Sequence, residues 1–261
     1  MQNELSTLQW YMDAGVDEAV QDTPRNVMET HSVAPIAPAA APALPVALTA
    51  MPLHHMNAAS LEASRQLADA AQSLAELRTA IQGFEGCAIK RTATNTVFAD
   101  GNPQARLMLI GEAPGAQEDI QGIPFCGPSG HLLDKMLASI GYDRTNAYIT
   151  NTLFWRPPGN RQPNSEELAI CRPFVEKHVA LIDPALLVLV GGTAAKAMLG
   201  TEQGITRLRG KSYSYRTPYR DKDYPVAVIY HPSYLLRQPA QKRATWQDLL
   251  AIEASMQNLL R

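Results

Sequence analysis

Three carboxylates follow the apolar run Leu107–Ile110: Glu112, Glu118 and Asp119. A carboxylate that is fixed in place can position a water molecule or stabilise a developing cation. The glycines of the segment Gly111–Gly115 allow the backbone to turn tightly before these residues. The same acids could instead mark the first turn of a helix, where the helix dipole favours negative charge. The spacing leaves both interpretations open.

An imidazole and an amide follow two further apolar runs. His231 comes directly after Val226–Tyr230, and Asn151 comes directly after Ala147–Thr150. An imidazole can donate a hydrogen bond to an oxyanion that forms during a reaction. A side-chain amide carries a donor and an acceptor, so it can read an imide edge. A structural histidine and an asparagine in an Asx turn are the simpler alternatives.

Two loops carry apolar side chains that could contact a ligand. Phe125 lies in the Gly- and Pro-containing segment 122–125, where its ring could face a base or sugar or could cap the core. The segment 234–237 places two leucines between Tyr234 and Arg237. Apolar tips beside an arginine suit insertion into a base stack, although the same residues could open a packed helix.

The runs that precede these residues read as parallel strands of one sheet. With Leu186–Val190, the sequence holds four apolar runs, and each is followed by Gly, Pro, Asn or His. Helix-like segments separate the four runs. Ligands bind at the carboxyl ends of the strands in an open parallel sheet. The order predicts an α/β fold: a three-layer α/β/α sandwich around a central four-stranded parallel sheet with right-handed crossovers. The predicted helices cover residues 130–140, 164–181, 193–199 and 240–260, and Asn164 and Glu167 form a capping-box pattern for the second.

The chain divides into four parts by composition. The apolar pattern in residues 1–30 predicts a short N-terminal helical segment. The Ala- and Pro-rich composition of residues 31–58 predicts a disordered linker. Helical spacing over 59–83 predicts a helix that leads into the domain 84–261.

Charge and composition limit the function classes. The chain of 261 residues has a net charge of −2 and no apolar run of the about 20 residues that a membrane helix needs. Its N-terminus lacks a secretory pattern and its three cysteines are scattered, which predicts a reducing cytoplasm. Residues 205–243 hold nine bases and two acids, with tyrosines between them. This stretch is either a footprint for a polyanion or an ordinary solvated loop.

Taken in order, these residues resemble the uracil-DNA glycosylase superfamily, most closely its family 4. The resemblance covers roughly residues 84–250, and the ordered set of motifs is far more specific than any one of them. The matching motifs are Gly111–Gly115 with Glu118 and Asp119, Gly122–Phe125, Thr150–Asn151, Arg156–Arg161, the segment around Arg209 and Gly210, and His231–Arg237. The resemblance implies an enzyme that flips uracil out of DNA and hydrolyses the N-glycosidic bond, and it leaves open whether other deaminated bases are also substrates.

The resemblance also implies roles for individual residues. Phe125 would stack on uracil, Asn151 would read its N3–H and O4, and His231 would hydrogen-bond O2 of the leaving base. One of the carboxylates Glu112, Glu118 and Asp119 would place the water. Leu235 with Tyr234 would fill the vacated stack, and Arg237 with the basic residues 207–222 would hold phosphates. The remaining substrate-binding positions are Gly111, Ala113, Asn160, Arg209 and Ser233.

This chain departs from the family 4 pattern at its cofactor. Family 4 enzymes bind a 4Fe–4S cluster through four cysteines, and Cys87 and Cys171 align with two of them, whereas the other two positions hold Phe84 and Trp155. Two thiolates cannot replace four ligands. We therefore expect no cluster and no metal, with Phe84 and Trp155 filling the space. Cys126 reads as a buried or partly buried loop thiol.

A second departure concerns the catalytic acid. Some branches of the superfamily carry Asp or Asn at the position of Ala113, which has no functional side chain here. We therefore expect Glu112, Glu118 or Asp119 to position the water. We expect a monomeric repair enzyme of the bacterial cytoplasm and nucleoid that acts on uracil-containing DNA and contacts no membrane. A damaged-DNA-binding protein without catalysis is the alternative, and an enzyme of free nucleotides fits less well because the glycine turn lacks a P-loop Lys-Ser/Thr.

Overall fold

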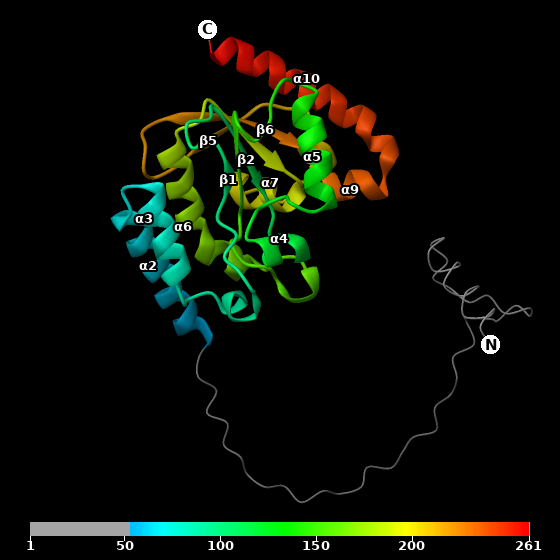
Figure 1. The fold of residues 1–261 in the computed structure, drawn as a ribbon. Coiled ribbons are helices and arrows are strands. Elements are labelled where there is room, and N and C mark those ends of the chain that lie inside the picture. The colour runs from blue at the N-terminus through cyan, green and yellow to red at the C-terminus, as the bar shows by residue number, and fades with distance from the viewer. Residues whose placement is uncertain (1–52, 261) are drawn as a thin grey trace, which may run out of the picture. The chain divides into compact units, whose positions relative to one another are not determined.

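The computed structural model describes residues 53–260, which fold around one six-stranded sheet (Figure 1). Four strands are parallel neighbours: β2 (Leu107–Gly111), β3 (Ala147–Asn151), β4 (Leu186–Val190) and β6 (Asp223–Ile229). The predicted parallel sheet is therefore confirmed. Because β2 and β3 are in register at Gly111 and Asn151, the chemistry-bearing ends of these strands lie side by side.

Two short antiparallel strands, which the sequence analysis did not predict, extend the sheet at its edges. The sheet order is β1-β3-β2-β4-β6-β5. β1 (Asp100–Gly101) pairs with β3, and β5 (Tyr213–Arg216) pairs with β6. A two-residue strand is too short to show an alternating pattern. The strand β5 lies within the basic stretch 205–243. Its alternating tyrosines, Tyr213 and Tyr215, were there attributed to the charged stretch and not to a strand.

Helices cover both faces of the sheet, as predicted for a three-layer sandwich (Figure 1). Every residue of β2, β3 and β4 is buried, which is typical of parallel strands packed on two sides. One face packs against α2 (Leu53–Ala70), α3 (Leu74–Gly83), α6 (Ser165–Ile182), α7 (Gly192–Leu199) and α8 (Ile205–Leu208). The other face packs against α5 (Pro128–Ala138), α9 (Pro232–Arg237) and α10 (Lys242–Leu259).

Short elements join these helices to the strands. The helix α4 (Ala116–Gln121) follows β2. The described residues also form 3-10 turns at Ala88–Thr92, Pro158–Asn160 and Pro239–Gln241. The capping box predicted for α6 is confirmed: the Asn164 side chain accepts from the Glu167 backbone N–H at 2.8 Å, and Glu167 accepts from the Asn164 backbone N–H at 2.9 Å.

The region predicted as one helix over 59–83 is two helices. Ser73 caps α3 by accepting from the Glu76 backbone N–H, while the Glu76 carboxylate accepts from the Gln72 backbone N–H. These two hydrogen bonds cap the start of α3 and separate it from α2. The helix α2 begins at Leu53, inside the predicted linker 31–58, and the predicted segment 1–30 lies outside the described residues. No helix of the described part is long and apolar enough to cross a membrane.

Candidate active site

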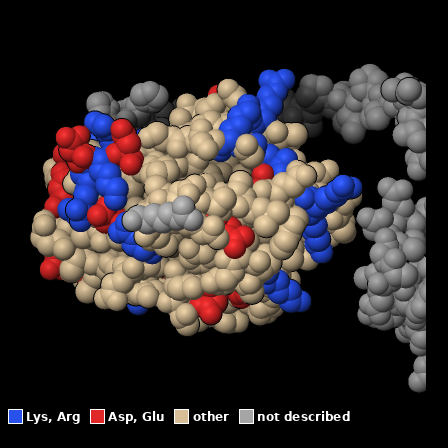
Figure 2. Space-filling view, turned by 90° about the horizontal axis from the view of Figure 1, so that it is seen from above, with Lys and Arg blue, Asp and Glu red and all other residues tan. Residues whose placement is uncertain are grey.

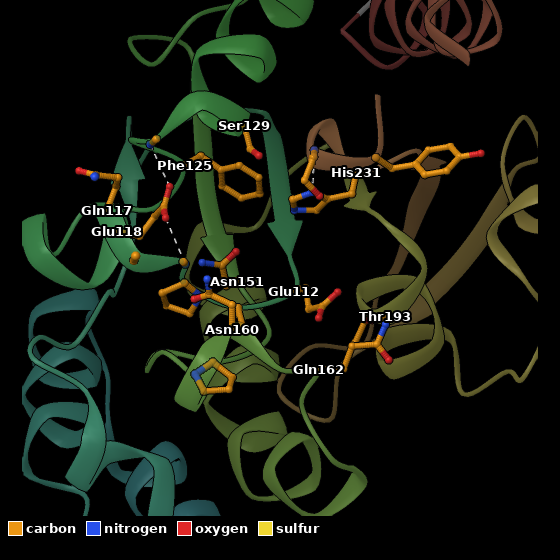
Figure 3. A pocket seen from close by; sticks show the side chains of 18 of the residues that line it. Glu112, Gln117, Glu118, Phe125, Ser129, Asn151, Asn160, Gln162, Thr193 and His231 are labelled. Atoms are coloured by element: carbon orange, nitrogen blue, oxygen red, sulfur yellow. Dashed lines mark hydrogen bonds between the residues drawn. The ribbon is translucent and has the colours of Figure 1, made fainter. Parts of the chain in front are cut away.

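A cavity of about 660 Å³ opens at the carboxyl edge of the parallel strands (Figure 3). The loops after β2, β3, β4 and β6 all contribute to its wall, which is where a parallel sheet gathers ligand-binding residues. The cavity thus brings together most of the residues singled out from the sequence. Those that line it are Glu112, Ala113, Glu118, Phe125, Asn151, Asn160, His231, Ser233, Tyr234 and Arg237.

Asn151 presents an unsatisfied acceptor in this cavity. Its side chain is 1% exposed, and its Oδ1 has no hydrogen-bond partner among the described residues. Leaving a buried acceptor unpaired costs about 1–3 kcal/mol, so an unpaired acceptor in a native protein calls for an explanation such as a ligand that binds to it. Gly111 makes the arrangement possible, because a Cβ at Gly111 would lie 2.4 Å from Asn151 Oδ1 and 2.5 Å from the Phe125 ring.

The Phe125 ring forms a second wall. Its backbone has φ of 53°, the left-handed region that non-glycine residues seldom adopt. The ring lies 5.6 Å from the His231 imidazole, centre to centre, with 30° between the two planes. Figure 3 shows these two rings near each other, with Asn151 and Glu112 beneath them. A flat base could therefore meet an aromatic face on one side and hydrogen-bonding groups at its edge.

His231 is held in one tautomer by the turn that starts α9. Its Nδ1 accepts from the Ser233 backbone N–H at 3.1 Å and lies 2.8 Å from Ser233 Oγ. Burial, aided by the positive charge of Arg237, lowers the pKa of His231 to about 4. The imidazole is therefore neutral at pH 7 and carries its proton on Nε2. Such a group can donate a hydrogen bond without bringing a positive charge into the cavity.

The two glutamates of the cavity differ in their surroundings. Burial raises the pKa of Glu112, and a hydrogen bond with Thr193 opposes that rise. The Glu118 carboxylate instead bridges two loops: Oε2 accepts from the Gly115 N–H at 3.1 Å, and Oε1 accepts from the Gly127 N–H at 2.9 Å. Figure 3 shows Glu118 drawn toward both backbone donors. Glu112 therefore has the freer carboxylate, and Glu118 orders the rim.

Asp119 does not fit the role predicted for it. Its carboxylate is 3% exposed and accepts from the backbone N–H groups of Thr94 at 2.8 Å and Asn95 at 3.2 Å. These contacts tie α4 to a distant loop and lie outside the cavity wall. Asp119 and Glu118 are adjacent on α4, so their side chains point in different directions around the helix.

Leu235 and Arg209, which were predicted to contact the DNA, are engaged in contacts within the protein instead. Leu235 is 1% exposed and packs into the core, whereas its neighbour Leu236 is 45% exposed. Arg209 forms an ion pair with the buried Asp248 at 2.8 Å and lies over the Tyr230 ring, so it fastens α10 to the sheet. Neither residue lines the cavity.

Part of the basic stretch is neutralised at the other edge of the sheet. Arg216 pairs with Asp223 at 3.0 Å, and Lys222 pairs with Asp183 at 2.7 Å. The turn that carries these groups precedes β6, whereas the cavity follows it. Figure 2, which looks at the molecule from above, shows basic and acidic side chains intermingled at one side. Arg237, in contrast, lines the cavity.

Comparison with known proteins agrees with this geometry. Residues 98–250 match the model of the uracil DNA glycosylase superfamily. The chain belongs to this superfamily. It is 38% identical over 185 residues to a type-4 uracil-DNA glycosylase of Archaeoglobus fulgidus, a match that covers 69% of this chain and 92% of the relative. A type-4 uracil-DNA glycosylase of Sulfurisphaera tokodaii is 34% identical over 185 residues, covering 69% of this chain and 83% of the relative.

The residues at the cluster positions of this glycosylase do not fit a 4Fe–4S group. Phe84 and Trp155 are 3% and 1% exposed, and their rings lie 6.5 Å apart in a stacked arrangement. The Phe84 ring also packs edge-on against Phe174 at 5.3 Å. Trp155 is fixed further, because its Nε1 donates to Thr96 Oγ1 at 3.0 Å. At two of the four positions that the resemblance assigns to the thiolates of such a cluster, the chain therefore carries aromatic carbon.

The two remaining cysteines interact with each other. A hydrogen bond with Cys87, together with burial, raises the pKa of the Cys171 thiol. Cys126 is partly buried. Within residues 53–260, no group of three or more His, Cys, Asp or Glu side chains could hold a metal ion.

Some cavity residues of this glycosylase were missed from the sequence. Gly192 and Thr193 begin α7, one residue after the end of β4, so the rule that placed Asn151 and His231 at strand ends would also have found them. Gly191 precedes them with φ of 98°, and a Cβ there would lie 3.0 Å from the His231 Cβ. Gln117 reaches the cavity from α4, Ser129 from the first turn of α5 and Gln162 from a loop, and no local sequence signal marks them.

Proposed function

We propose that this protein removes uracil from DNA by flipping the nucleotide into the cavity and hydrolysing its N-glycosidic bond. The observation that carries the proposal is the buried, unpartnered Oδ1 of Asn151 beside the Phe125 ring and the neutral His231. Uracil offers what this set lacks: a flat ring, an N3–H donor and two carbonyl oxygens. Relatives named as type-4 uracil-DNA glycosylases support the same substrate.

Asn151 supplies the choice of base. Its Oδ1 accepts the N3–H of uracil, and its amide donates to O4. Cytosine carries an acceptor at N3 and an amino group at C4, so both contacts become repulsive or unpaired. A site built around buried hydrogen bonds rejects a base that leaves them unpaired. Phe125 stacks on the ring that Asn151 holds. The range of other deaminated bases depends on the same contacts.

His231 stabilises the leaving group. As the bond between C1′ and N1 breaks, the electron pair moves onto the base, and O2 of the uracilate gains negative charge. The Nε2–H of His231 donates to that oxygen. One preorganised donor of this kind contributes about 10²–10³-fold in rate.

Glu112 is the carboxylate that we assign to the water. Its freer, half-buried carboxyl group has a raised pKa, as a general base needs. The water oxygen bonds to C1′ as its proton passes to Glu112, and an abasic site remains. Glu118 acts indirectly, because its two backbone hydrogen bonds hold the loops at Gly115 and Gly127 in place.

Contact with the DNA strand falls to α9 and its surroundings. Arg237 lines the cavity and is well placed for a phosphate, as are the polar side chains of Asn160 and Ser233. We assign the wedge in the vacated stack to the exposed Leu236, beside Tyr234, rather than to the buried Leu235. We further propose that the enzyme works as a monomer and without an iron–sulfur cluster, its aromatic cluster Phe84, Trp155 and Phe174 holding the loops together instead.

The test is single-turnover cleavage of a labelled oligonucleotide that carries one uracil, followed by alkali. We expect strand cleavage at uracil by the wild type, none at thymine or cytosine, and losses of about 10²-fold or more in His231→Ala and Glu112→Gln. Tight binding of uracil-containing DNA without cleavage would instead make the protein a damage-binding module. Full activity of His231→Ala would remove the assigned oxyanion donor.

A further inference from the structure

Arg144 lies behind the cavity, in the loop between α5 and β3, and joins three parts of the fold. Its guanidinium donates to Asp134 on α5 at 3.0 Å and to Asp100 on β1 at 2.6 Å. It also donates to the carbonyl oxygens of Pro124 at 3.1 Å and of Phe125 at 2.5 Å. The two carboxylates fix the planar guanidinium, which then holds two consecutive carbonyls of the loop that carries the stacking ring.

The loop at Phe125 needs such support because its backbone is unusual. Phe125 has φ of 53°, a conformation that persists in a non-glycine residue only when its surroundings enforce it. On one side, its carbonyl lies so close to α5 that a Cβ at Gly130 would sit 1.6 Å from the oxygen. On the other side, Arg144 binds the same carbonyl. The carbonyl is therefore clamped between a helix backbone and a guanidinium.

The clamp determines where the ring points. With its carbonyl fixed, Phe125 directs its ring toward Gly111 and the His231 imidazole. A Cβ at Gly111 would lie 2.5 Å from this ring, so little space separates the ring from the strand end. Release of the carbonyl would let the backbone relax toward a common conformation and would turn the ring out of the cavity wall.

We infer that Arg144 is a positioning residue that sets base recognition by clamping the Pro124 and Phe125 carbonyls, without touching the base itself. The inference rests on the proposed function, in which Phe125 stacks on the flipped uracil. Arg144 does not line the cavity, and its side chain, which is 26% exposed, is paired with Asp100 and Asp134. Its effect must therefore pass through Phe125.

A double-mutant cycle between Arg144 and Phe125 tests this inference. In Arg144→Met we expect the single-turnover rate on a uracil oligonucleotide to fall about 10²-fold, the usual consequence of misplacing a group near the reaction by about 1 Å. In a Phe125→Ala background the same substitution should cost less than about 3-fold, because the ring that it positions is gone. Asp134→Asn, a milder change, should fall between wild type and Arg144→Met.

Arg220→Met is the matched control for lost stability. Arg220 also donates to a backbone carbonyl, that of Ala180 at 2.9 Å, and lies 3.9 Å from a carboxylate of Asp183. It lies in the turn between β5 and β6, at the opposite edge of the sheet, and does not line the cavity, so the structure does not place it with Arg237 at the DNA. Thermal unfolding of all variants shows whether Arg144→Met folds as well as this control. If it does not fold, the cycle is run with Asp134→Asn and Phe125→Ala.

A binding measurement separates this inference from the proposed function. Oligonucleotides with thymine or with 2′-fluoro-2′-deoxyuridine, whose glycosidic bond resists hydrolysis, give the preference for uracil as a ratio of dissociation constants. We expect Arg144→Met to lower that ratio and Arg220→Met to leave it unchanged. The clamp would be overturned if Arg144→Met lowered the single-turnover rate equally in the wild-type and Phe125→Ala backgrounds. It would also be overturned if Arg144→Met left the ratio of dissociation constants unchanged. A wild type that prefers uracil without cleaving it would overturn the proposed function alone.

Discussion

Replacing Asn151 by alanine should separate function from stability. In most buried positions the loss of an amide costs stability, because a hydrogen bond is broken. Asn151 Oδ1 has no partner to lose among residues 53–260, so its removal takes away an unpaired buried acceptor. That relief, about 1–3 kcal/mol, offsets the contacts that the smaller side chain gives up. We therefore expect the free energy of unfolding to stay within about 1 kcal/mol of wild type.

The loss of activity should be large. Asn151→Ala removes two hydrogen bonds to the base, each contributing about 1–1.5 kcal/mol net. Their sum, about 2–3 kcal/mol, corresponds to a fall of roughly 30- to 150-fold in kcat/KM. The assay is the initial rate of abasic-site formation at several concentrations of an oligonucleotide with one uracil, together with urea unfolding of the same preparation.

The neighbouring Thr150 provides the opposite case as a control. Its buried hydroxyl donates to the Phe98 carbonyl at 2.7 Å. Thr150→Val keeps the shape and leaves that carbonyl unpaired, so it should lower the free energy of unfolding by about 1–3 kcal/mol and leave kcat/KM unchanged. The reasoning would be refuted if Asn151→Ala lost as much stability as Thr150→Val or retained wild-type kcat/KM.

Three further predictions follow from the site. Activity should fall as the pH drops through the raised pKa of Glu112, because the base must be ionised, and Glu112→Gln should lose both rate and this acidic limb in a pH–rate profile. Leu235→Ala should lower the free energy of unfolding by about 2–5 kcal/mol, whereas Leu236→Ala should change it by less than about 0.5 kcal/mol and weaken binding to uracil-containing duplex, as urea unfolding and fluorescence anisotropy would show. Protein purified without oxygen should contain no stoichiometric iron by metal analysis and should keep its activity in an iron chelator; about four irons per chain would contradict the account.

Much of the site was predictable because a parallel sheet brings the carboxyl ends of its strands together. Glu112, Asn151 and His231 each follow an apolar run, and the cavity contains all three. Such residues need only strand order and strand ends, which the apolar periodicity supplies. The four parallel strands and the capping box of α6 follow from equally local patterns.

The errors concern direction and distant partners. The helix α9 spans six residues, too short a pattern to show that Leu235 points inward and Leu236 outward. Arg209 is fixed by Asp248, 39 positions along the chain, and no local pattern announces that ion pair. Asp119 is likewise taken up by backbone donors in a remote loop. No role was predicted for Arg144, because its four acceptors come from three separate segments of the chain.

The most direct test of the central claim is the amount of free uracil released by the wild-type protein from an oligonucleotide that contains one uracil, measured by chromatography under single-turnover conditions. The account predicts one free uracil for each abasic site formed, with no release of thymine from a matched oligonucleotide. Binding of the uracil oligonucleotide with no release of the base would contradict it.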